Sequence, residues 1–247
     1  MFRVKAARWN LRIVLVRPRN PLNIGAAARA MANFGLRDLM VVAPHPPVWQ
    51  ETRSAVGAES VVQSARAVGD LGEAIADRTW VVGTTSGSRR NLDRELMPLD
   101  KPELWLPQRA RAGKVALLFG SEKTGLSNQE ISFCHALVRI PTSARCPSMN
   151  LGQAVAVCAY ELAHCGACAV RQPAMVVHQS APATVQAVDH VLERLERVLA
   201  EVGYIRPRNR ESTLIKLRRL LTDLALTNND VKILGGILAQ IEWKLAK

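Results

Sequence analysis

The chain has 247 residues, 48% of them hydrophobic, and its 33 Lys and Arg against 21 Asp and Glu give a formal net charge of +12. This apolar content is ordinary for a folded globular protein and too high for a disordered one. No apolar run approaches the ~18 residues that a membrane span requires, and the run after the basic N-terminus is too short for a signal peptide. Five cysteines do not suit a disulfide framework, so we expect a reducing, cytoplasmic location.

The basic residues are concentrated in two segments. Residues 1–20 hold six basic side chains and no acidic one, and residues 206–219 hold six against a single Glu. Such clusters suit a polyanion, because neutralising phosphates releases condensed counterions, while solvated surface charge is an equal alternative. Scarce aromatic residues argue against a surface that stacks many bases. The candidate contacts to a nucleic acid are Arg17, Arg19, Arg206, Arg208, Arg210, Arg218 and Arg219.

Short apolar runs alternate with helical patterns over the first 170 residues. Helices are predicted at residues 24–34, where Gly35 can cap the helix end, and at 150–168. The runs between them are apolar nearly throughout, which is typical of parallel strands covered on both faces. This alternation predicts an α/β domain with a mainly parallel sheet over residues 1–170. The predicted strands are residues 11–16, 39–42, 79–82, 115–119 and 136–140.

The composition changes after residue 170. Residues 171–183 contain Pro173, Ser180 and Pro182 and have the character of a linker. Beyond the linker, apolar residues recur at helical spacing in three stretches separated by Gly203 and by residues 228–230. Residues 184–247 are therefore predicted to form a small helical C-terminal domain or arm.

Four loops that follow predicted strands are dense in Gly, Ser, Thr, Asn and Pro. They span residues 17–29, 83–90, 119–127 and 141–150. Small residues let backbone donors and hydroxyl groups approach a ligand closely, and α/β proteins place their sites in such loops. Four loops of this kind indicate one ligand site.

Several familiar sites do not fit these loops. Residues 120–125 imitate a phosphate-binding loop, but Leu126 stands where that motif requires Lys, and no G-x-G-x-x-G follows the first strand. Cys165 and Cys168 match C-x-x-C, yet no second such pair completes a tetrahedral site. Small buried residues are the favoured interpretation of both cysteines, so no metal is expected.

Three of these segments resemble a known family. Asn20–Arg29, Leu118–Ser127 and Ser148–Val155 look like the three signature motifs of the SPOUT superfamily of RNA methyltransferases, SpoU branch, in that family's order and spacing. The C-terminal segment Leu234–Trp243 is similar to that of the TrmJ-type tRNA ribose methyltransferases. The second likeness is less specific, since it rests on one helix.

The resemblance implies a parallel-sheet SPOUT fold with a deep trefoil knot, an obligate homodimer with the active site at its interface, and S-adenosylmethionine as cofactor. The positions that match the family's catalytic and supporting residues are Arg29, Asn23, Glu122, Ser148 and Asn150. Those that match its cofactor contacts are Thr84, Thr85, Ser86, Gly120, Ile140, Pro147, Ser148 and Met149.

The activity implied is methylation of a tRNA ribose 2′-hydroxyl, at anticodon-loop position 32 on cytidine or uridine. Two alternatives stay open: a ribosomal RNA substrate, and an RNA-binding protein that has kept the fold without the activity. For Arg29, clamping a phosphate of the target suits a permanently charged guanidinium better than accepting a proton does. A solvent-facing helix residue is the competing interpretation of Arg29.

Overall fold

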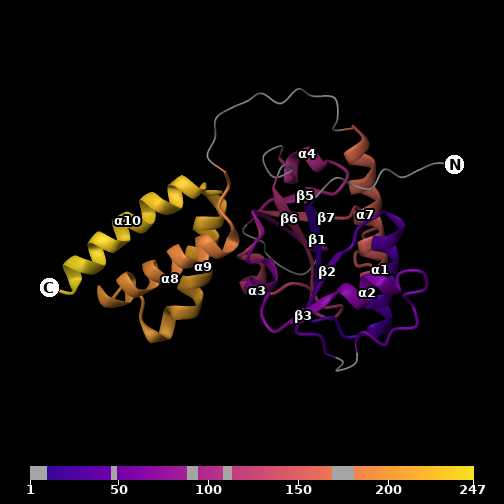
Figure 1. The fold of residues 1–247 in the computed structure, drawn as a ribbon, viewed down its shortest axis with the longest axis horizontal. Coiled ribbons are helices and arrows are strands. Elements are labelled where there is room, and N and C mark those ends of the chain that lie inside the picture. Colours follow the sequence, from indigo (N-terminus) through magenta and orange to yellow (C-terminus); the bar gives the residue numbers. More distant parts are fainter. Residues whose placement is uncertain (1–9, 46–48, 88–93, 108–112, 169–180) are drawn as a thin grey trace.

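A computed structural model of the chain describes residues 10–45, 49–87, 94–107, 113–168 and 181–247. Within these residues seven strands form one sheet in the order β3-β2-β1-β6-β4-β7-β5, and all their pairings are parallel (Figure 1). Their carboxyl ends therefore meet at one edge of the sheet, where ligands bind in such folds. The strands are β1 (Asn10–Val16), β2 (Asp38–Val42), β3 (Arg66–Val68), β4 (Trp80–Thr84), β5 (Leu96–Pro98), β6 (Lys114–Phe119) and β7 (Ala136–Arg139).

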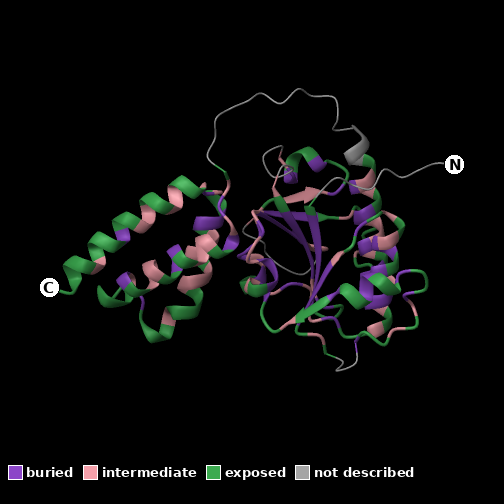
Figure 2. Ribbon diagram, in the orientation of Figure 1, coloured by how far each residue is buried: buried purple, intermediate pink, exposed green. Residues whose placement is uncertain are grey.

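Helices cover both faces of the sheet, and β1 shows why. Its alternate residues Ile13 and Leu15 face one apolar core, while Val14 and Val16 face another, so positions 13–16 of the strand are all apolar. Figure 2 shows the sheet buried throughout its centre. The first core is closed by α1 (Pro21–Asn33), α2 (Glu59–Ser64), α4 (Pro102–Trp105) and α7 (Leu151–Cys168), and the second by α3 (Leu71–Ile75) and α6 (Asn128–Ile131).

The predicted strands are confirmed with shifts of one or two residues at their ends, whereas β3 and β5 were not predicted. Each of these two is a three-residue strand at an edge of the sheet, too short to show a periodic pattern. The predicted helix 24–34 begins three residues earlier, because the Asn20 side chain accepts a hydrogen bond from the Leu22 N–H at 2.9 Å and Pro21 suits the first turn.

The C-terminal residues form the predicted three-helix arm, made of α8 (Val185–Glu201), α9 (Arg210–Asp223) and α10 (Asn228–Leu245) with a short turn η2 (Pro207–Asn209). Its own core is apolar and includes Val191, Leu192, Leu221 and Leu238. No helix in the described part of the chain has the length and apolarity needed to cross a membrane.

The arm packs on the α/β unit of its own chain, beside α3 and α6 (Figure 1). Val185 belongs to the second core of the sheet, and its N–H donates to the Arg78 carbonyl at 2.8 Å. From α9, the Thr222 hydroxyl donates to the Ser132 carbonyl at 3.2 Å. The Arg218 guanidinium lies 3.9 Å from the centre of the Phe133 ring.

Asp77 forms ion pairs with two buried arginines, Arg12 and Arg78, beside the contact between the arm and the α/β unit. Arg12 donates to one of its carboxylate oxygens at 2.8 Å and Arg78 to the other at 2.6 Å. The hydrogen bond from Arg78, with the charges of Arg78 and Arg12, holds the pKa of Asp77 well below its ordinary value, against an opposing effect of burial. Arg12, counted above in the N-terminal basic segment, is thus a buried structural residue.

Replacing Asp77 by Asn is expected to lower the free energy of unfolding at pH 7 by about 1 kcal/mol, a modest value because the carboxylate is 43% exposed. A depressed pKa in the folded state stabilises above the unfolded pKa of about 3.9 and ceases to do so as pH falls below it. Urea unfolding of the wild type and of Asp77→Asn should therefore show a difference in the free energy of unfolding that becomes smaller below about pH 4. Asp100→Asn, at an exposed turn, is the matched control, and an equal loss there would contradict this role of Asp77.

Candidate active site

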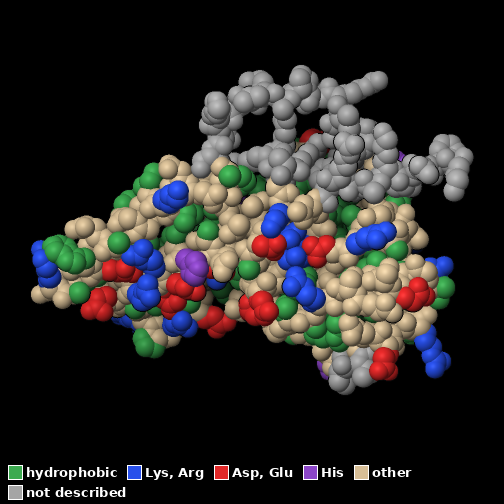
Figure 3. Space-filling view, in the orientation of Figure 1, with side chains coloured by type: hydrophobic (Ala, Val, Ile, Leu, Met, Phe, Trp, Pro, Cys, Tyr) green, Lys and Arg blue, Asp and Glu red, His purple; other side chains and the backbone are tan. Residues whose placement is uncertain are grey.

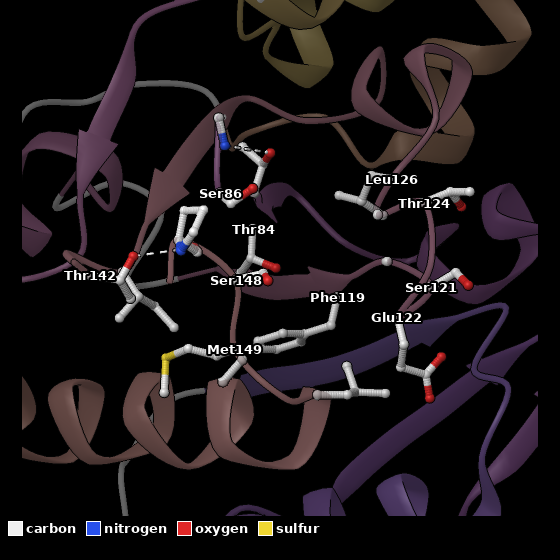
Figure 4. Close-up of a pocket in the computed structure, with 18 of the residues that line it drawn as sticks. Thr84, Ser86, Phe119, Ser121, Glu122, Thr124, Leu126, Thr142, Ser148 and Met149 are labelled. Carbon is white, nitrogen blue, oxygen red and sulfur yellow. Dashed lines mark hydrogen bonds between the residues drawn. The ribbon is translucent and has the colours of Figure 1, made fainter. Parts of the chain in front are cut away.

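A pocket of about 370 Å³ lies at the carboxyl ends of β4, β6 and β7, beside the start of α7 (Figure 4). Three of the four predicted loops contribute to its wall. All eight residues predicted as cofactor contacts line it: Thr84, Thr85, Ser86, Gly120, Ile140, Pro147, Ser148 and Met149. Its volume and mixed polar and apolar lining are those of a site for a small organic molecule.

Residues 120–127, here called the second-motif loop, form one wall and bend back on themselves. The Gly125 N–H donates to the Ser121 carbonyl at 2.8 Å, and Gly125 adopts a left-handed conformation with φ of 66°. This turn brings backbone against Gly120: a Cβ there would lie 2.1 Å from the Gly125 carbonyl carbon. Only glycine therefore fits at position 120 without moving the loop.

Asn150 connects the opposite wall to α7. Its side-chain oxygen accepts a hydrogen bond from the Gly152 N–H at 2.9 Å, as an N-cap residue does. The helix then packs closely on α1, where a Cβ on Gly152 would lie 2.6 Å from that of Ala26. Asn150 is thereby held beside the pocket, with its amide group still able to donate.

Glu122, Asn23 and Asn150 form a continuous hydrogen-bonded chain. The Asn150 amide donates to Asn23 at 2.9 Å, and the Asn23 amide donates to Glu122 at 2.8 Å. Glu122 also accepts the N–H groups of Arg19 at 2.9 Å and Asn20 at 3.3 Å. Three predicted residues from three separate loops are thus brought together.

These contacts decide the charge of Glu122. Burial is the largest influence and disfavours its ionised form, but the hydrogen bonds from Asn23, from its own backbone and from Arg19 and Asn20 together lower its pKa. Glu122 is therefore an ionised carboxylate whose lone pairs are engaged. Such a group orients its neighbours and is a poor acceptor for a proton.

Arg29 lies on α1 with its side chain exposed, and none of the described residues bonds to it. It does not line the pocket, and neither do Asn23 and Asn150, whereas Glu122 and Ser148 do. An exposed guanidinium keeps all its donors free for an anion.

The predicted nucleic-acid contacts fall into two groups. The arginines that already have acidic partners are mostly on the arm: Arg218 pairs with Asp189, Arg219 with Asp223 at 3.6 Å, and Arg210 with Glu196 at 2.6 Å. Figure 3 shows basic and acidic side chains interspersed over this part of the surface. Arg17 is likewise paired, with Glu130.

The other group consists of three exposed arginines, Arg19, Arg206 and Arg208. The Arg206 side chain donates to the Gly203 carbonyl at 3.4 Å. These three are the better-placed candidates for phosphate contacts, because binding a phosphate would break no ion pair described for them. The first nine residues, with their three basic side chains, lie outside the described part of the chain.

The described residues contain no group of three or more His, Cys, Asp or Glu side chains arranged to hold a metal ion. Cys165 and Cys168 lie at the end of α7, and their side chains are outside the described part.

Five apolar residues of the pocket wall were not predicted from the sequence as cofactor contacts. Its members come from the ends of β6 and β7, the second-motif loop and the first turns of α7: Phe119, Leu126, Val138, Leu151 and Ala154. A signal did exist for three of them, since Phe119 and Leu126 stand within a predicted loop and Leu151 directly after one, whereas Val138 and Ala154 stand inside a predicted strand and a predicted helix. Their apolar character is equally typical of the core, so the sequence could not separate the two roles.

Residues 10–160 match the SpoU rRNA Methylase family, and residues 186–247 match the C-terminal domain of the tRNA methyltransferase TrmJ. The tRNA (cytidine/uridine-2′-O-)-methyltransferase TrmJ of Klebsiella pneumoniae is 39% identical over an alignment of 242 positions that covers 94% of this chain and 96% of that protein. The protein of the same name from Sodalis glossinidius is 36% identical over 234 residues, 94% and 91% of the two chains.

The crystal structure of TrmJ from Z. mobilis ZM4 is also similar, with a TM-score of 0.80 at 31% identity, covering 94% of this chain and 98% of that one. The likeness includes both the α/β unit and the helical arm, because it extends over nearly the whole of both chains. The chain therefore belongs to the SpoU methylase family and, within it, groups with the TrmJ proteins.

Proposed function

We propose that this chain is an S-adenosylmethionine-dependent tRNA ribose 2′-O-methyltransferase acting on cytidine or uridine. The observation that carries the proposal is the end-to-end likeness to relatives named for that reaction, arm included. The convergence of three of the four predicted loops on one pocket supports it independently of the names. A ribosomal RNA substrate has less support, since the family model for the arm is that of a tRNA enzyme.

The residues of the pocket fit S-adenosylmethionine. The hydroxyl groups of Thr84 and Ser86 and the backbone beside Gly120 offer hydrogen-bonding partners, while Phe119 and Met149 offer apolar surface. The backbone of Gly125 and Leu126 packs directly on Gly120, so main chain forms this part of the wall. When bound, the cofactor supplies an electrophilic methyl group on a positively charged sulfur.

The protein's own contribution is to position the ribose and its phosphate. Ser148 and Asn150 carry donors and acceptors suited to sugar hydroxyl groups, and Glu122 fixes Asn23, which in turn fixes Asn150. Arg29 clamps a phosphate beside the target, with both prongs of its guanidinium available. Orientation of this kind removes much of the entropic barrier to methyl transfer.

The proposal extends to assembly. The enzyme acts as a homodimer, supported by the apolar side chains of Leu22, Met149 and Tyr160, exposed by 52%, 36% and 49% at the start of α1, before α7 and on α7. Sedimentation velocity of the full chain tests this, and a monomer at micromolar concentration would contradict it.

It also extends to topology and location. A trefoil knot is supported by the strand order, in which β6 lies between β1 and β4, and β7 lies between β4 and β5. The chain divides into a SPOUT domain at 1–170, a linker at 171–183 and the arm at 184–247. Cytoplasmic location follows from the tRNA substrate.

The target is position 32 of the anticodon loop. Purified protein, labelled S-adenosylmethionine and a tRNA transcript should give one ribose-methylated nucleoside, mapped to position 32 by mass spectrometry of nuclease fragments. The matched control is the same tRNA with a single 2′-deoxyribose at position 32, which should accept no methyl group. Methylation of that control would refute the position, preference for ribosomal RNA fragments would refute the substrate, and absence of cofactor binding would indicate a non-catalytic RNA-binding protein.

A further inference from the structure

Arg17 has an unusual backbone conformation at the end of β1. Its φ of 51° lies in the left-handed region, which residues with a side chain rarely adopt. Its N–H still donates to the carbonyl of Val42, the last residue of the neighbouring strand β2, at 2.8 Å. Surroundings that hold a residue in such a conformation often do so at a functional site.

The Arg17 side chain is directed toward the second-motif loop and α6. Its guanidinium forms an ion pair with Glu130, whose side chain is only 9% exposed, and its second prong donates to the other Glu130 oxygen at 3.1 Å. Glu130 also accepts the Ser127 N–H at 2.6 Å and so caps α6. Arg17 therefore neutralises a buried carboxylate at the end of the second-motif loop.

The same guanidinium donates to the Gly125 carbonyl at 3.3 Å. Gly125 closes the turn that lines the pocket, together with Thr124 and Leu126 (Figure 4). Arg17 thus holds this turn by bonding to the Gly125 carbonyl, and residues of the same turn line the cavity.

The β1–α1 loop and the second-motif loop each send a side chain to the other. Arg17 extends from the β1–α1 loop to Gly125 and Glu130, and Glu122 extends from the second-motif loop to the N–H groups of Arg19 and Asn20. Glu122 also receives Asn23, so this connection continues to the predicted ribose-binding side chains. Losing the Arg17 connection would free one side of the cofactor pocket.

We propose that Arg17, acting through Glu130 and Gly125, is a positioning residue for the cofactor pocket and not a contact to RNA phosphate. The inference deepens the proposed function and rests on it. Turning its paired N–H groups to a phosphate would take Arg17 away from Glu130, and an unpaired buried carboxylate is strongly unfavourable. The charge of Arg17 is thus used inside the protein, unlike that of Arg19 beside it.

Arg17→Gly removes the side chain, and glycine adopts the left-handed conformation readily. The variant therefore tests the loss of the bonds to Glu130 and Gly125 without adding backbone strain. Isothermal titration without RNA should show S-adenosylmethionine binding weakened about tenfold, as expected for loss of one charged hydrogen-bonding partner. The affinity for tRNA and its dependence on salt should stay as in the wild type, and kcat at saturating cofactor should fall less than about twofold. Arg17→Lys, which can reach Glu130 but cannot bridge both partners, should recover part of the cofactor affinity.

Two further variants complete the test. Glu130→Gln should weaken cofactor binding similarly, and adding it to Arg17→Gly should cost less than the product of the single effects, because both remove one interaction. Arg19→Ala is the matched control: its cofactor affinity should be unchanged, and its tRNA salt slope should fall by about one.

Wild-type cofactor affinity in Arg17→Gly, or a reduced salt slope with tRNA in that variant, would overturn the inference. If Arg17→Gly does not fold, full cofactor affinity in Glu130→Gln would overturn it as well. A wild-type protein that binds no S-adenosylmethionine would instead refute the proposed function, so the two failures are distinguishable.

Discussion

Replacing Arg29 by Ala is expected to lower kcat for tRNA methylation by about 100-fold or more, because a charged group that fixes the target in its reactive geometry is lost. Affinity for S-adenosylmethionine should stay within about threefold, since Arg29 does not line the pocket. Stability should also change little, because the side chain is exposed and bonded to none of the described residues. Single-turnover kinetics, isothermal titration and thermal unfolding measure these three quantities.

Two variants make the Arg29 experiment specific. Arg37→Ala removes an exposed arginine from the connection between α1 and β2 and should leave the rate unchanged. Arg29→Lys keeps the charge without the bidentate geometry, so it should remain impaired if two-pronged phosphate binding is required. A wild-type rate in Arg29→Ala would show that Arg29 is an ordinary surface residue.

Gly120→Ala is expected to abolish measurable cofactor binding, a loss of about 100-fold or more, because overpacking here must displace backbone. The added Cβ would lie 2.1 Å from the Gly125 carbonyl carbon and 2.2 Å from the Leu126 nitrogen. Backbone cannot yield as a flexible side chain can, so the turn that lines the pocket has to move. Isothermal titration with S-adenosylmethionine measures the loss, and circular dichroism establishes that the variant is folded.

Gly236→Ala is the matched control for this change. Gly236 lies in α10, and a Cβ added there would have open space within 4 Å, so alanine should bind the cofactor normally and gain up to about 1 kcal/mol of stability. Full cofactor affinity in Gly120→Ala would mean that the second-motif loop is less closely packed than these distances indicate.

The central elements were predictable because their signals are local. β1 and β6 are apolar at nearly every position, as buried parallel strands must be, and α7 is a long apolar helix. The short helix α6 escaped prediction, although Ser127 and Glu130 form a capping box around it. With four residues it has no periodicity, and its position depends on packing.

Charge is where sequence and structure differ most. The sequence groups Arg12, Arg17 and Arg218 with the other arginines as surface charge available to a polyanion. In the structure Arg12 is buried and pairs with Asp38 and Asp77. Arg17 pairs with Glu130, and Arg218 pairs with Asp189. Their partners lie between 26 and 113 residues away in the chain, beyond the reach of any local pattern.

The sequence by itself determined the parallel α/β fold, the helical arm and the loops that surround the pocket, since hydrophobic periodicity and loop composition are written along the chain. Only the tertiary structure decided how those loops are held. It brings Asn23 to Glu122 and Arg17 to Gly125, and it places α9 against Ser132 of the same chain. Hydrogen bonds and ion pairs depend on distance in space, which becomes defined only when the sheet has assembled and its strand ends meet at one edge.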